Sequence, residues 1–135
     1  MAVQLSAAAR NAILDAIETA IGVSAILRIR STAVPANCAA ADAGTVLATL
    51  NLPSDFMAAA SAGVKNLLGT WQDTSADAAG TAAHYRVYDS AGTTCHIQGT
   101  ITATGGGGDM TLDNIVLALA QLVTVTSFSL TAPNA

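Results

Sequence analysis

The chain has 135 residues, of which 52% are hydrophobic and only 10% are charged, and its formal net charge is −4. With five basic residues in all, it lacks the positive patch of a nucleic-acid-binding protein, so direct contact with nucleic acid is not expected. The longest apolar run, residues 115–120, is far shorter than the roughly 20 residues that cross a bilayer, and the N-terminus has no signal-peptide pattern. We therefore expect a single domain over residues 1–135, made in a cytoplasm and without a membrane partner.

The low charge also bears on association. Small residues must cover much of a surface with so few charges, and such a surface is weakly protected against contact with other proteins. This composition indicates a protein that partners largely cover, although an alanine-rich source composition explains it equally well. In a cytoplasm Cys38 and Cys95 are expected to be reduced thiols, and two cysteines alone do not establish a disulfide.

The first element expected is an N-terminal α-helix over residues 6–21. Ser6 can cap its start and Gly22 can end it. Its apolar residues fall at four-residue spacing, which is typical of a helix with one buried face. This face packs on its own domain or reaches a neighbouring subunit. The apolar residues are Leu5, Ala9, Ile13, Ile17 and Ile21, with Leu14 beside them.

Short strands and loops follow the helix. Residues 24–30 predict a strand in which Arg28 and Arg30 face outward, and residues 45–52 predict another. Between them, residues 31–44 contain few large side chains and predict a long loop.

The next segments are less regular. Residues 54–60 fit a short helical turn or a loop, residues 64–71 fit a strand that ends in the single tryptophan, and residues 73–81 fit a loop.

The clearest pattern is a β-hairpin of residues 84–88 and 94–103, in which apolar or small residues alternate with polar ones. The loop between them ends in Gly92, which suits a turn that needs a left-handed residue. The expected opposite pairs are Val87 with Cys95 and Tyr85 with Ile97. The other face carries His84, Arg86, Tyr88, His96 and Gln98, and it is either a solvated face or a surface that recognises a protein or a sugar.

After the hairpin, residues 105–108 predict a flexible glycine connection and residues 110–112 a short strand. Residues 115–122 show no clean period. The pattern from residue 123 to 130 changes phase, which a β-bulge near residues 126–127 would explain. Around seven short strands predict an antiparallel, jelly-roll-like β-sandwich with one N-terminal α-helix.

No pattern predicts a catalytic, metal or cofactor site. Cys95 and His96 are adjacent in a strand and should point to opposite faces, and the face with His84 lacks a third strong ligand. The glycines before Asp109 are not followed by the lysine of a phosphate-binding loop, and Ser61 lacks the first glycine of a nucleophile elbow. We therefore expect a protein that is not an enzyme and needs no cofactor.

Several segments resemble a family of small proteins encoded in tailed bacteriophages and prophages. The resemblance covers nearly the whole chain and is carried by residues 10–18, 35–38, 83–89, 95–101, 105–109, 112–114 and 123–125. The chain departs from the family at residues 115–120, where an apolar run replaces a polar turn.

This resemblance implies a component of the virion. The hypothesis is a capsid decoration or cement protein that binds the major capsid protein and copies of itself as a homo-oligomer within the lattice, assembled in the bacterial cytoplasm. A tail or neck component is the first alternative, and a carbohydrate-binding module for host attachment is the second. The candidate contact residues are Ile13, Ile17, Ile115, Leu117, Leu119, Arg86, Tyr88 and His96.

Overall fold

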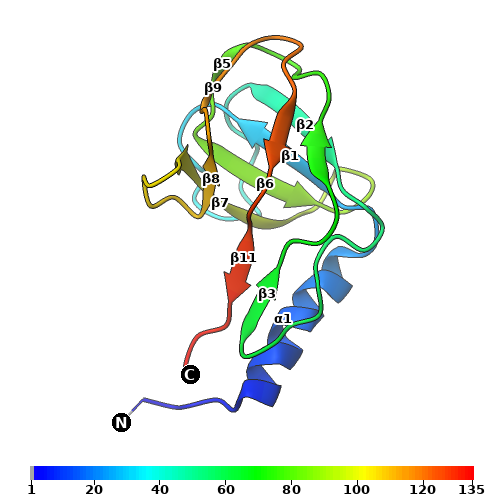
Figure 1. Ribbon diagram of the computed structural model, residues 1–135, viewed down its shortest axis with the longest axis vertical. Helices are drawn as coiled ribbons and strands as arrows, with labels where there is room; N and C mark the ends of the chain where they lie inside the picture. The colour runs from blue at the N-terminus through cyan, green and yellow to red at the C-terminus, as the bar shows by residue number, and fades with distance from the viewer. Residues whose placement is uncertain (1) are drawn as a thin grey trace.

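The computed structural model describes residues 2–135 and is mainly β with one helix, as expected (Figure 1). Within these residues, no helix is long and apolar enough to cross a membrane. The elements in chain order are α1 (Ala7–Ile21), β1 (Ile26–Arg30), β2 (Val46–Asn51), β3 (Val64–Asn66), β4 (Trp71–Asp73), β5 (Gly80–Thr81), β6 (His84–Tyr88), β7 (Cys95–Ala103), β8 (Met110–Leu112), β9 (Val116–Leu117), β10 (Val123–Val125) and β11 (Ser129–Thr131).

A curled five-stranded sheet with the order β2-β1-β6-β7-β8 forms the body of the protein. Three two-stranded ladders accompany it, namely β10 with β4, β11 with β3, and β5 with β9. The expectation of a purely antiparallel fold is wrong at one pair, because β8 runs parallel to β7.

A compact glycine loop makes this parallel pairing possible. Between β7 and β8 the chain reverses twice, and Gly105 and Gly107 have φ angles of +87° and +80° that other residues adopt only with strain. A Cβ atom on Gly108 would lie 2.8 Å from the backbone nitrogen of Thr102. The tightly folded crossover therefore requires glycine at these positions, whereas the sequence had predicted a flexible connection.

The hairpin of β6 and β7 forms, but its register differs from the predicted one by two positions. Val87 lies opposite Ile97, and Cys95 lies opposite Tyr88 after a bulge. The carboxylate of Asp89 accepts the backbone N–H groups of Thr93 and Thr94 at 3.0 and 3.3 Å, and this widens the loop. The bulge places Cys95 opposite Tyr88, whereas the alternating sequence pattern predicted that Cys95 lies on the apolar face.

The core lies on the apolar face of the sheet and is closed by aromatic side chains. Trp71 is buried as expected, and its ring centroid lies 5.4 Å from that of Phe128. Phe128 in turn makes an edge contact with Tyr85 at 5.6 Å. Leu27, Ile29, Ala48 and Leu50 are completely buried beneath them.

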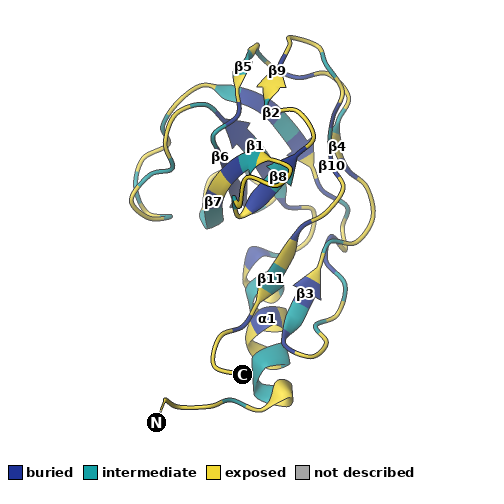
Figure 2. Ribbon diagram, turned by 60° about the vertical axis from the view of Figure 1, so that its left-hand side comes forward, coloured by how far each residue is buried: buried dark blue, intermediate teal, exposed yellow. Residues whose placement is uncertain are grey.

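The helix, β3, β11 and both chain termini lie together at one end of an elongated molecule (Figures 1 and 2). The helix begins as predicted, with the Ser6 hydroxyl accepting the N–H of Ala9 at 3.2 Å, and it ends at Gly22. Its buried residues are Leu14 and Ile21, whereas Ile13 is 43% exposed. The buried face of the helix is therefore rotated about the helix axis relative to the predicted apolar stripe, toward Leu14 and away from Ile13.

Two long predicted strands are each divided into two. Gly69, with a φ of +74°, separates β3 from β4, and the expected bulge near residue 126 is a break between β10 and β11. The two divided segments pair with each other on both sides of their breaks, since β10 pairs with β4 and β11 pairs with β3. Residues 54–60 form no helical turn, and Met57 makes an isolated antiparallel bridge to Leu67.

Candidate functional site

The polar face of β6 and β7 is covered by the long loop of residues 31–44. The Arg86 guanidinium donates to the carbonyl oxygens of Ala40 and Cys38 at 3.1 and 2.8 Å. Gln98 donates its side-chain amide to the carbonyl oxygen of Pro35 at 2.7 Å. The prediction of a solvated polar face is therefore wrong, because the guanidinium has more donors than the sheet can satisfy and the loop supplies the acceptors.

Asp42 holds this loop on the sheet. Its carboxylate accepts from Arg30 at 2.8 Å, from Arg86, and from the Tyr88 hydroxyl at 2.6 Å. Burial works against the charge, but the hydrogen bonds from Tyr88 and Arg86 and the Arg30 charge hold the pKa of Asp42 below its usual value. We call Asp42, Arg30, Arg86 and Tyr88 the Asp42 cluster.

His84 lies beneath the same loop and is completely buried. Its Nδ1 atom is 2.9 Å from the carbonyl oxygen of Thr32, so the neutral ring carries its proton there. Burial, together with the charges of Arg30 and Arg86, lowers the pKa of His84. The predicted partner on this face, His96, is only half-buried.

The Tyr88 ring is not available to stack on a sugar. It is only 2% exposed, and the guanidinium carbons of Arg28 and Arg86 lie 4.8 and 5.9 Å from its centroid. Of the three candidate contact residues on this hairpin, Arg86 and Tyr88 are therefore interior groups, a position that alternation alone did not reveal.

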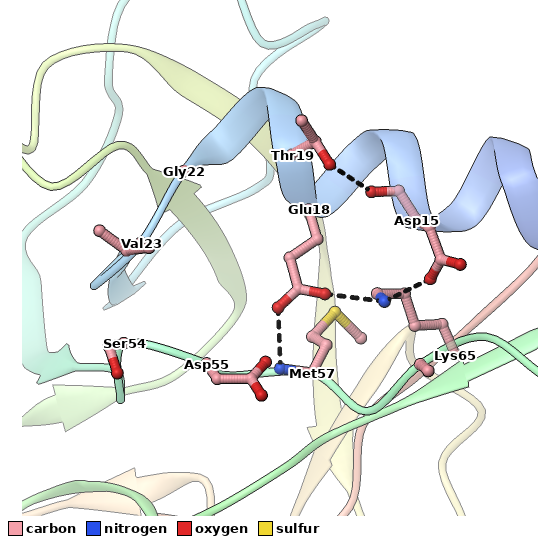
Figure 3. Close-up of a pocket in the computed structure, with 10 residues that line it drawn as sticks. Asp15, Glu18, Thr19, Gly22, Val23, Ser54, Asp55, Met57 and Lys65 are labelled. Atoms are coloured by element: carbon pink, nitrogen blue, oxygen red, sulfur yellow. Dashed lines mark hydrogen bonds and ion pairs between the residues drawn. The ribbon is translucent and has the colours of Figure 1, made fainter.

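A second charged cluster fastens the helix to the strands below the sheet (Figure 3). The Lys65 ammonium contacts Asp15 and Glu18, both at 2.7 Å, and donates to the carbonyl oxygen of Ala58 at 3.0 Å. Burial opposes the charge, but the hydrogen bonds to both acids raise the pKa of Lys65. We call Lys65, Asp15 and Glu18 the Lys65 cluster, and its lysine remains a cation rather than a nucleophile.

An open groove with a volume of about 620 Å³ lies beside the Lys65 cluster. Figure 3 shows it between the second half of α1 and residues 54–59. Because all three donors of the ammonium already have acceptors, the lysine has no proton left to offer a ligand in this groove.

The apolar candidates divide into exposed and buried positions. Leu119 is 67% exposed, whereas Leu117 is only 3% exposed and Ile115 packs against the core. On the helix, Ile13 is exposed and Ile17 packs inward. Leu117 therefore lies in the core and Ile17 and Ile115 pack partly against it, and a role of these three residues in contacts stays a prediction.

Two exposed apolar residues were missed near Leu119. Val116 and Leu122 are 61% and 57% exposed, and a spacing of three residues joins them to Leu119. This segment begins with the two-residue strand β9 and arches over the end of the molecule opposite the termini (Figure 1). The spacing was visible in the sequence, but so short a strand does not establish which residues face outward.

Within residues 2–135, no three or more His, Cys, Asp and Glu side chains are grouped to hold a metal ion. Comparisons with known protein families, curated proteins and solved structures found no match to this chain. Any proposed function therefore has to rest on the geometry of the structure. This geometry offers two charge clusters whose ions are paired within the fold and an exposed apolar segment at residues 116–122.

Proposed function

We propose that this chain is a structural component of a bacteriophage particle, a decoration or cement protein that binds the capsid shell and stabilises it. The observation that carries the proposal is the exposed apolar segment, in which Val116, Leu119 and Leu122 are all more than half exposed. Apolar side chains that are exposed together mark sites of protein contact, and these three lie within residues 116–122. The sequence resemblance to phage proteins supplies the kind of particle.

The shape of the molecule supports a bridging role. The apolar segment is at one end, and Ile13 belongs to the helix at the other end, where it is 43% exposed (Figure 1). An elongated protein that exposes apolar side chains near both ends can contact two neighbours at once. Small contact energies then add across a lattice of many copies, including contacts between copies of the chain itself.

The interior also fits a mechanical role. In both clusters the charged groups are each other's partners, so they stabilise the fold and leave no activated nucleophile or base. We propose accordingly that the protein is not an enzyme. We keep the jelly-roll-like sandwich in this proposal, with the curled five-stranded sheet as one of its layers.

Sedimentation with shells of the major capsid protein tests the proposal. The purified chain should co-sediment at a fixed, saturating ratio, and the double variant Leu119→Ser, Leu122→Ser should lose most of this binding. Val23→Ser is the matched control, because Val23 is 68% exposed but lies next to the helix end and outside the 116–122 segment. All three proteins should unfold at the same temperature.

A chain that ignores shells but joins purified tails would contradict the decoration role and favour a tail or neck component. Equal binding by the double variant would show that the apolar segment is not the contact surface. Specific binding in a glycan screen would favour the host-attachment alternative, although the burial of Tyr88 argues against its predicted site.

A further inference from the structure

Two cysteines that are far apart in the sequence lie on the same side of the sheet. Cys38 belongs to the covering loop, and its carbonyl oxygen accepts from Arg86 of β6 at 2.8 Å. Cys95 begins β7 and lies opposite Tyr88, whose hydroxyl bonds to Asp42 of the same loop. The β-bulge is what brings Cys95 to this side, and both cysteines are half-buried free thiols.

The surroundings of the two sulfurs fit a resting, reduced pair. The Cys95 thiol is 3.3 Å from the carbonyl oxygen of Ile97, to which it donates. Burial and the neighbouring Cys38 thiol raise the pKa of Cys95 to about 11. Because the thiolate is the reactive form, the Cys95 thiol should react slowly at neutral pH and faster in alkaline solution.

We propose that Cys38 and Cys95 form an intramolecular disulfide when the folded chain meets a low-molecular-weight disulfide such as oxidised glutathione. One cysteine thiolate attacks a sulfur of oxidised glutathione, forms a mixed disulfide and releases one glutathione thiolate. The second cysteine thiolate attacks the protein sulfur of that mixed disulfide and releases the second glutathione. Both cysteines are thereby oxidised, two electrons pass to the glutathione, and the two thiol protons end on its released thiols.

The bond would fix the covering loop to β7. This loop shields Arg86 and His84, which are 1% and 0% exposed, so its opening would admit water to the interior polar groups. A covalent link between distant positions also restricts the unfolded chain. The inference does not depend on the phage proposal, since it concerns only the contact between the loop and the sheet.

Mass spectrometry of the folded, full-length chain tests this inference. Incubation with oxidised glutathione at mildly alkaline pH should give a monomer lighter by two hydrogen atoms, and peptide mapping should join Cys38 to Cys95. The thermal unfolding midpoint should rise by about 5 °C or more and return to its first value after reduction. Cys38→Ser and Cys95→Ser are the matched controls, and each should form only a single glutathione adduct with no such rise.

Three results would overturn the inference. The first is a wild-type chain that ends with glutathione on both cysteines, and the second is one that links only to other copies. The third is a folded chain whose mass does not change although the same chain, once unfolded, reacts at both thiols. The serine variants should unfold at the wild-type temperature under reducing conditions, so that the missing rise after oxidation reflects the lost sulfur and not a folding defect.

Discussion

The two charge clusters share a burial pattern but differ in the charge of the ion that has two partners. In the Asp42 cluster, one carboxylate that is 37% exposed serves two guanidiniums whose side chains are 8% and 2% exposed. In the Lys65 cluster, one ammonium that is 2% exposed has two carboxylates, which are 50% and 20% exposed. The cations are interior and the acids reach the surface in both.

This difference indicates which residue of each cluster contributes most to the stability of the fold. Within the part of the chain that the structure describes, Asp42 is the one carboxylate in contact with either buried guanidinium. Lys65 keeps a second acid if it loses the first. A buried charge left without a partner costs several kcal/mol, whereas a surface charge left alone is solvated by water. Redundancy, rather than the number of contacts, should therefore decide the sensitivity to mutation.

The largest effect is expected from Asp42→Ala. This change leaves the buried guanidiniums of Arg30 and Arg86 without a counter-charge, and it also releases the covering loop. Since the Asp42 side chain is about one-third exposed, water can enter, and we expect a loss of about 2–4 kcal/mol in the free energy of unfolding. Urea denaturation measures this loss.

The matched control is Asp55→Ala, which removes an exposed acid beside the groove and should change stability by less than about 0.5 kcal/mol. Equal stability of the two variants would show that Asp42 does not hold the loop.

A smaller effect is expected from Lys65→Met. Here the buried charge itself is removed, the apolar stem is retained, and the two remaining carboxylates can turn to water. We expect a loss of about 1–2 kcal/mol, with faster backbone hydrogen exchange in α1 and β3 but not in the sheet. A loss as large as that of Asp42→Ala would contradict the argument that the cost is set by a buried charge left without a partner.

The buried histidine and the two clusters should also lose their contributions to stability in different pH ranges. Folded His84 binds a proton less readily than the unfolded chain, because its pKa lies below the ordinary 6.5. The unfolded state therefore takes up more protons as the pH falls below 6.5, and the free energy of unfolding falls with it. Asp42, whose pKa lies below 3.8, adds a further loss as the pH falls below that value. The raised pKa of Lys65 acts oppositely, so its contribution is complete below pH 10.5 and is lost as the pH rises further.

Thermal unfolding between pH 5 and 8 tests the histidine part of this prediction. His84→Gln should remove most of the slope below pH 6.5, because it can still donate to Thr32 but cannot take up a proton. His96→Gln, which leaves the buried ring in place, should keep the slope. If both variants retain the wild-type slope, the buried imidazole is not its source.

Local sequence patterns predicted the local parts of this fold. The helix between Ser6 and Gly22 and the left-handed conformation of Gly92 depend on neighbours within a few residues, and both are confirmed. The mainly β character follows in the same way from alternation. These features need no knowledge of the distant chain. The predicted outward position of Arg30 is wrong, because the covering loop buries this side chain.

Contacts between distant segments account for what the sequence did not predict. Alternation showed that Arg86 and Tyr88 share a face, but it did not reveal that residues 37–42 would cover this face with carbonyl oxygens and Asp42. The parallel pairing of β8 likewise depends on how glycines 105–108 fold against Thr102. Charge pairs such as Lys65 with Asp15 join residues 50 positions apart, and periodicity does not report them.

The smallest effect is expected from Tyr88→Phe, which removes the one neutral donor of the Asp42 cluster. The Lys65 cluster has a neutral partner in the carbonyl oxygen of Ala58, so each cluster has two charged partners and one neutral one around its shared ion. Without the Tyr88 hydroxyl, Asp42 still has both guanidiniums, and the ring can still pack against Arg28. We therefore expect a loss of about 0.5–1.5 kcal/mol in the free energy of unfolding.

Tyr85→Phe is the control for this change, because Tyr85 lies on the other face of β6 beside Phe128. Only the Tyr88 variant should raise the pH at which acid unfolding begins, since the Tyr88 hydrogen bond lowers the pKa of Asp42. An acid transition that stays in place would mean that the two guanidiniums alone keep Asp42 ionised. The loop would then be held by charge pairing, and the hydroxyl would contribute only its packing.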